Sequence, residues 1–136
     1  MVLSGKYNLL FQDEHSPDMI PLTMEFAKEI HKSYKRGSQG DTFVTKIMLG
    51  IFGCTPAYDR YFKDAAKTFS VCGTSFNENS LRSLWHYYNE HSQALESLRS
   101  ELVIEGINYT PMKLMDMCLF QIGLDKLGSD TDNDED

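Results

Sequence analysis

Cys54 is a residue whose type and position could support nucleophilic chemistry. It stands in Gly53-Cys54-Thr55-Pro56, directly ahead of a predicted helix start at Pro56. Backbone amides and the dipole at a helix N-terminus lower the pKa of a thiol, and the thiolate is the nucleophilic form. Such a nucleophile needs a nearby base, and the sequence spacing nominates none of the histidines. A small buried residue at a tight corner between two helices is the interpretation that we favour.

A second group that could carry chemistry consists of Asp59, Arg60 and Asp116. Asp116 lies in a mostly apolar stretch, residues 112–120, where a carboxylate should be paired because a lone buried charge is costly. Lys46 occupies a similar position in another apolar stretch, so we expect Asp116 to pair with Lys46 or Arg60. Perturbed acids gather at functional sites, which keeps a small enzyme as an alternative, but a structural ion pair is favoured.

The histidines and cysteines do not form a metal-binding pattern. His86 and His91 are five residues apart, which places them on different sides of a helix, while His15 and His31 lie in other segments. The three cysteines are widely spaced and contain no Cys-x-x-Cys pair. No phosphate-cradling glycine loop is present either. We therefore expect no metal and no cofactor.

Basic residues recur along two predicted helices. They are Lys28, Lys32, Lys35 and Arg36 on the first helix, and Arg60, Lys63 and Lys67 on the third. If the two stripes are adjacent, they could meet the phosphates of a nucleic acid. Acidic residues interrupt both stripes, so ordinary solvated faces are the favoured interpretation, with contact to a nucleic acid or an acidic partner as the alternative.

The charge of the chain is concentrated at one end. The formal net charge is -7, but residues 129–136 hold five acids and no base; removing them leaves 15 acids against 13 bases, or -2. A net-acidic domain lacks the excess of positive charge expected of a dedicated nucleic-acid binder. No apolar run reaches the ~18–20 residues that cross a bilayer, so we expect no membrane partner. Free thiols without an export signal predict a cytoplasmic protein.

Five predicted helices position these residues. Apolar residues at helical spacing, with Pro, Thr or Asn near the starts and Gly near the ends, place them over 21–36, 42–52, 56–69, 78–105 and 111–127. The last is apolar on most sides, which indicates a central, largely buried helix. Short strands could still lie in residues 1–12 or 69–76. The sequence predicts an all-α, bundle-like domain over residues 1–128 and a disordered acidic tail over residues 129–136.

Two stretches of the sequence resemble a known but uncharacterised group of bacterial proteins. Residues 45–62 contain Gly-Cys-x-Pro-Ala-Tyr-Asp-Arg-Tyr-Phe, and residues 109–117 read Tyr-Thr-Pro-Met-Lys-Leu-Met-Asp-Met. The resemblance rests on the two stretches together, covers about a quarter of the chain and is fairly specific. It implies no activity, cofactor or catalytic residue.

The function that the sequence favours is non-enzymatic, because no catalytic pattern outweighs its structural interpretation. We expect a small cytosolic helical module that binds another protein. One alternative is an enzyme with a site around Cys54 or the Asp59, Arg60 and Asp116 group. A second alternative is a nucleic-acid-associated protein that uses the two basic stripes.

Overall fold

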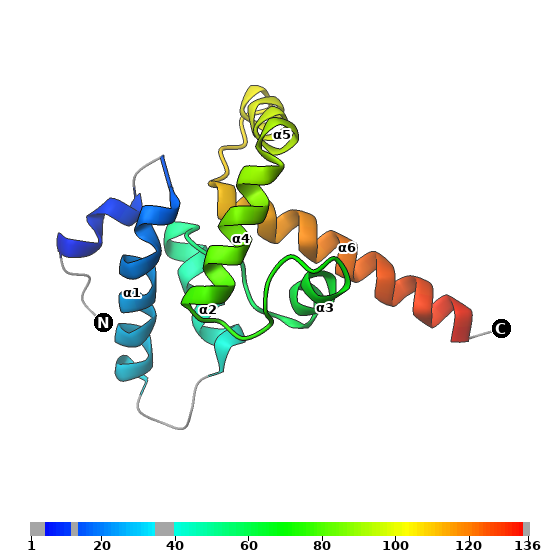
Figure 1. Cartoon of the computed structure of the whole chain (residues 1–136), viewed down its shortest axis with the longest axis horizontal. Coiled ribbons are helices and arrows are strands. Elements are labelled where there is room, and N and C mark those ends of the chain that lie inside the picture. Colours follow the sequence, from blue (N-terminus) through cyan, green and yellow to red (C-terminus); the bar gives the residue numbers. More distant parts are fainter. Residues whose placement is uncertain (1–4, 12–13, 35–39, 135–136) are drawn as a thin grey trace.

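The computed structural model describes residues 5–11, 14–34 and 40–134, and the side chains of Lys6 and of residues 126–134 lie outside that description. Within it every regular element is helical (Figure 1), which confirms the all-α fold class. Two short 3-10 helices, η1 (Gly5–Phe11) and η2 (Pro17–Met19), precede six α-helices. These are α1 (Ile20–Ser33), α2 (Asp41–Phe52), α3 (Arg60–Thr68), α4 (Glu78–Glu90), α5 (Ser92–Ile104) and α6 (Pro111–Asp134).

Several helix ends follow the capping signals of the sequence. Gly53 ends α2 with φ 64°, a left-handed conformation that glycine adopts without the steric cost of a side chain. The Asn77 side chain accepts a hydrogen bond from the Ser80 amide at the start of α4, at 2.8 Å. Thr110 accepts one from the Lys113 amide in the first turn of α6, at 3.1 Å. The structure confirms these three predicted helix ends. They could be predicted because each depends only on neighbouring residues.

The start of α3 differs from the predicted start at Pro56. The helix begins at Arg60, and Asp59 caps it by accepting a hydrogen bond from the Phe62 amide at 2.9 Å. Thr55 is not the cap, because no helix starts after it: the next helix begins five residues later, and the Thr55 hydroxyl donates to the carbonyl oxygen of Pro56. Residues 53–59 therefore form an extended, buried segment between α2 and α3, which we call the connector.

The predicted long helix over residues 78–105 is in fact two helices, α4 and α5, which run in different directions (Figure 1). The break falls at His91, whose ring stacks on Tyr87 with centroids 4.2 Å apart. A signal was present in the sequence. The apolar stripe stops at Tyr88 and resumes only at Leu95, so no apolar residue at 91 or 92 holds the chain to the core.

The hydrophobic core consists of two clusters, and the connector passes from one to the other. The first cluster joins residues of η1, α1 and α2, and includes Phe26, Met48 and Cys54. The second joins α3, α4 and α6, and includes Tyr58 and Met115. The connector thus contributes a buried side chain to each cluster, which makes it part of the core rather than a surface loop.

The last helix, α6, is not the central helix that its composition predicts. Its first turns are buried through residues such as Leu114 and Met115, but Met117, Ile122 and Leu124 are 36%, 38% and 41% exposed. The helix packs along α3 and then projects beyond it (Figure 1). It continues past the predicted end at Gly128 to Asp134. A disordered acidic tail was predicted over residues 129–136. The side chains of residues 129–134, and residues 135–136 as a whole, lie outside the described part of the chain.

Candidate functional site

Cys54, the predicted nucleophile, is buried in the connector. Its side chain is 4% exposed, and burial raises the pKa of the thiol to about 12, although a hydrogen bond with Thr23 acts in the opposite direction. The expectation of a lowered thiol pKa is wrong, because the helix that was to supply its dipole begins six residues later, at Arg60. A protonated, inaccessible thiol is a packing residue.

Side chains from other helices bind the polar backbone groups of the connector. Those side chains are Thr110 to the Gly53 carbonyl, Asp116 to the Ala57 amide at 2.9 Å, and Thr45 and Thr42 to the Tyr58 amide and carbonyl, both at 2.8 Å. A buried loop is costly unless such groups are paired, since each orphan costs about 1–3 kcal/mol. The connector is therefore the segment through which side-chain hydrogen bonds link α2, α3 and the start of α6.

Asp116 does not form the expected ion pair with Lys46 or Arg60. Its partner is the Ala57 amide, and no ion pair of Asp116 occurs within the described residues. Burial raises the pKa of the Asp116 carboxyl and Asp59 adds to the rise, while the Ala57 amide and the charges of Lys113 and Lys46 lower it. The nearby lysines thus act on Asp116 at a distance, without direct contact.

The four candidate catalytic residues do not converge on a concave site. Asp59 is occupied as the cap of α3, and Arg60 is exposed, with its guanidinium 5.5 Å from the centroid of the Tyr61 ring. Of the four, only Arg60 lines any of the cavities described for this structure. The observed geometry gives Cys54, Asp59 and Asp116 structural tasks.

A cleft lies between the N-terminal segment and the α4–α5 pair. Its volume is about 510 Å³, within the range of ligand sites. We call it the Arg99 cleft. Four segments line it: residues 14–17, the end of α4, α5 and the start of α6. Its lining residues are Glu14, His15, Ser16, Pro17, Trp85, Tyr88, Asn89, Glu96, Arg99 and Pro111.

A hydrogen-bond network fixes one wall of the Arg99 cleft. The Tyr88 hydroxyl donates to Glu96 Oε1 at 2.6 Å, and Arg99 Nη1 donates to both carboxylate oxygens of Glu96 at 2.8 and 2.9 Å. Arg99 Nε also donates to the Tyr109 carbonyl, which ties α5 to the segment ahead of α6. These side chains are held in place before any ligand arrives, so the wall is preorganised for binding.

The protonation states of this wall suit binding rather than proton transfer. Burial, followed by the hydrogen bond with Glu96, raises the pKa of Tyr88 to about 12. Burial opposes the charge of Arg99, but its contacts with Tyr88 and Glu96 outweigh that effect and raise the guanidinium pKa. A general base must lose its proton near the operating pH, and neither group does so at neutral pH.

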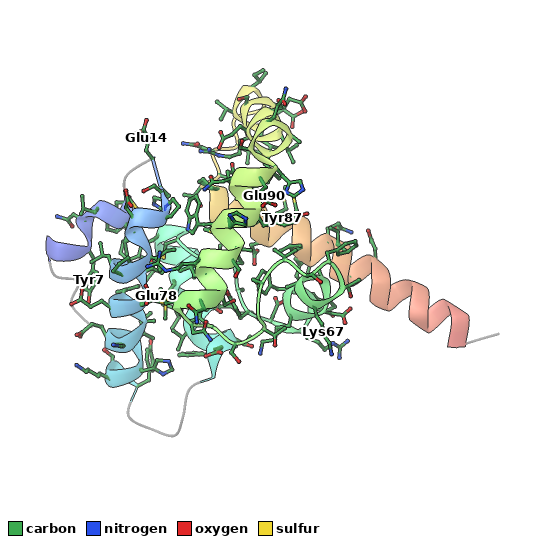
Figure 2. All side chains as sticks on the ribbon, in the orientation of Figure 1. Tyr7, Glu14, Lys67, Glu78, Tyr87 and Glu90 are labelled. Atoms are coloured by element: carbon green, nitrogen blue, oxygen red, sulfur yellow. The ribbon has the colours of Figure 1, made fainter. Side chains whose placement is uncertain are left out.

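Sequence reasoning missed this cleft, although part of it was visible. Glu96 and Arg99 have the three-residue spacing of an ion pair on one helix face. Tyr88 joins them only because the chain breaks at His91, so that α5 runs in a different direction from α4. Glu14 stands on the loop ahead of α1 (Figure 2), and nothing in the sequence places that loop beside α5.

The two basic stripes are not adjacent. The helices that carry them, α1 and α3, lie on opposite sides of α4 (Figure 1). Lys28 and Lys32 are exposed on α1, while Lys35 and Arg36 lie outside the described residues. The condition for one continuous basic surface is therefore not met.

The histidines lie apart, as their spacing predicted. His86 pairs with Glu90 one turn later, at 2.5 Å, and His91 Nδ1 lies 2.9 Å from the Tyr87 carbonyl oxygen. In the described ranges no three His, Cys, Asp or Glu side chains gather as metal ligands would. Nor does any described helix combine the length and apolarity that spanning a membrane requires.

Comparisons of the chain with protein-family models, with curated proteins and with solved structures found no match.

Proposed function

We propose that the protein is a small cytoplasmic interaction module that binds a basic segment of a partner protein in the Arg99 cleft. The observation that carries the proposal is the preorganised wall of Tyr88, Glu96 and Arg99 in a concave site. Binding surfaces gain affinity when their side chains are already fixed, because less conformational entropy is lost on association.

The charge of the cleft supports a basic ligand. Glu14 and Glu96 contribute two carboxylates to the lining, and Arg99 contributes one cation whose charge Glu96 already neutralises. The whole chain carries a formal charge of -7, which attracts positive partners over longer range. A lysine or arginine side chain can place its apolar stem along the Trp85 side of the cleft and its charge beside the carboxylates.

Membership of the bacterial group that shares the Gly-Cys-x-Pro-Ala-Tyr-Asp-Arg-Tyr-Phe segment is part of this proposal. The buried connector gives a reason for sharing it, since proteins that need the same packing need the same residues there. On this proposal the group shares a fold through the connector, while the ligand is recognised at the separate Arg99 cleft.

Selection from a random peptide library displayed on phage tests the proposal directly. We expect the selected peptides to carry lysine or arginine, and their affinity to fall as salt is added, because surface charges are screened. The variant Glu14→Lys reverses a charge at the cleft without touching the hydrogen-bond network, and Glu105→Lys is a matched reversal at an exposed residue outside it.

The two variants separate a local effect from an overall one. Glu14→Lys should weaken peptide binding about tenfold, which corresponds to about 1.4 kcal/mol, while Glu105→Lys should change it less than about twofold. Peptides without a basic residue, or an equal loss in both variants, would refute recognition by this cleft. Binding of small amines but of no peptide would instead indicate a small-molecule site.

A further inference from the structure

A second concavity lies beside α3 and shares no residue with the Arg99 cleft. Its volume is about 480 Å³, and we call it the α3 groove. Its lining residues are Thr42, Arg60, Lys63, Asp64, Lys67 and Thr74. Three cations and one carboxylate give this lining a formal charge of +2, in a chain whose net charge is -7.

Among the described residues the cations of the α3 groove have no ion pairs, unlike Arg82 and Arg99. Arg82 and Arg99 each pair with a glutamate about one helical turn earlier, Glu78 and Glu96, at 2.6 and 2.8 Å. Within the described residues no carboxylate lies at ion-pair distance from the three groove cations. In a chain with 20 acids and 13 bases, three neighbouring cations without such partners are available to an anion from outside.

Two of these cations, Arg60 and Lys63, lie where the dipole of α3 disfavours positive charge, whereas Lys67 lies in the last turn, where positive charge is favoured. Arg60 is its first residue and Lys63 lies at the end of its first turn, which contains no acidic residue. The N-terminus of a helix carries partial positive charge, so cations there cost about 0.3–1 kcal/mol each. A local cost of this kind marks places where function constrains the sequence, and a bound anion would remove it.

The groove also offers a neutral donor on its far wall. The Thr42 hydroxyl donates to the Tyr58 carbonyl, so its proton is used. Thr74 lies in the irregular segment between α3 and α4, is exposed, and makes no hydrogen bond among the described residues through its hydroxyl. An anion in the groove would therefore meet the cations of α3 and a hydroxyl from a different segment of the chain.

We infer that the α3 groove binds a small molecule that carries two or three linked phosphates. Arg60 and Lys67 are seven residues apart, or about 10 Å along the helix, so the three cations can converge on such a chain of phosphates. Figure 2 labels Lys67 beside α3. A long nucleic acid fits less well, because the second basic stripe is remote and the rest of the acidic chain repels an extended polyanion.

Titration calorimetry with sodium tripolyphosphate at low salt, on the full chain, tests the inference. The double variant Lys63→Gln with Lys67→Gln removes two groove cations. The matched control, Lys28→Gln with Lys32→Gln, removes two exposed lysines from α1 and changes the net charge equally. All four positions are on helix surfaces, and circular dichroism checks that both variants remain folded.

We expect the groove variant to raise the Kd for tripolyphosphate at least about tenfold and the α1 control to change it less than about twofold. Equal losses in both variants would overturn the inference, because they would indicate attraction to overall charge. No binding at millimolar tripolyphosphate would also overturn it. A single-stranded RNA dodecamer that binds more tightly than tripolyphosphate, and that is weakened by both variants, would assign the lysines to nucleic-acid contact instead.

Discussion

The hydrogen bond between Asp116 and the Ala57 amide gives a sharp test of the buried connector. Asp116→Ala removes the only side-chain acceptor that the structure gives this amide, whereas Asp116→Asn keeps an oxygen at the same place. Ala57 is 3% exposed, so water cannot easily replace the lost acceptor. The two variants therefore differ mainly in whether a buried N–H is satisfied.

The expected loss follows from the cost of that orphaned group. A buried amide without an acceptor costs about 1–3 kcal/mol, and removal of the partly buried carboxylate returns some of the desolvation energy. We expect Asp116→Ala to lower the free energy of unfolding by about 2 kcal/mol and Asp116→Asn to stay within about 1 kcal/mol of the parent. With a urea m-value of about 2 kcal/mol/M, the alanine variant should unfold about 1 M earlier.

Urea unfolding followed by tryptophan fluorescence measures the difference. Trp85 is the single tryptophan and is 5% exposed, so its emission reports the loss of the core directly. Equal destabilisation in the two variants would refute the argument, because it would mean that the charge of Asp116, and not its role as an acceptor, stabilises the connector.

Three further results should follow from the same structure. Because the pKa of the Asp116 carboxyl is raised in the fold, its contribution to the free energy of unfolding falls as pH rises from the unfolded pKa near 3.8 through the folded pKa. Urea titrations at several pH values should therefore show the stability of Asp116→Asn, relative to the parent, rising over that window. A constant difference between the two proteins would contradict this. A Cβ at Gly123 would overlap the backbone carbonyl of Tyr61, so Gly123→Ala should lower the free energy of unfolding by about 1–3 kcal/mol. A Cβ at Gly50, within α2, meets open space, so Gly50→Ala should raise it by about 0.5–1 kcal/mol. Thermal melts in which the two variants shift in the same direction would count against this packing. With a pKa of about 12, the Cys54 thiol should resist iodoacetamide at pH 8 until the chain unfolds, and peptide mapping that finds it labelled in the native protein would show the connector to be open.

The sequence predicts the helices of this protein best where the signal is local. The ends at Gly53, Asn77 and Thr110 depend on one residue and its immediate neighbours, and all three match the structure. The start at Pro56 fails because residues 59 positions away decide it: Asp116 holds the Ala57 amide in an extended segment. No pattern within residues 53–62 contains that information.

The candidate sites show the same division. The favoured interpretation of Cys54 agrees with the structure in its burial, but the residue lies in the connector and not at a tight corner between two helices. The Arg99 cleft was beyond prediction, since Glu14 and Glu96 meet only after α5 turns away from α4. The basic residues of α3 were recognised, but their groove depends on Thr42 and Thr74 from other elements.

The connector also constrains the order in which the chain can fold. Its Gly53 and Ala57 backbone groups take their partners from Thr110 and Asp116, 57 and 59 residues further along the chain. Contacts of such sequence separation form late, because a long loop must close first. During synthesis the helices up to α5 emerge without these partners, so the Gly53 carbonyl and the Ala57 amide stay without them until α6 arrives. The time before α6 docks is therefore the period in which the connector is held least firmly.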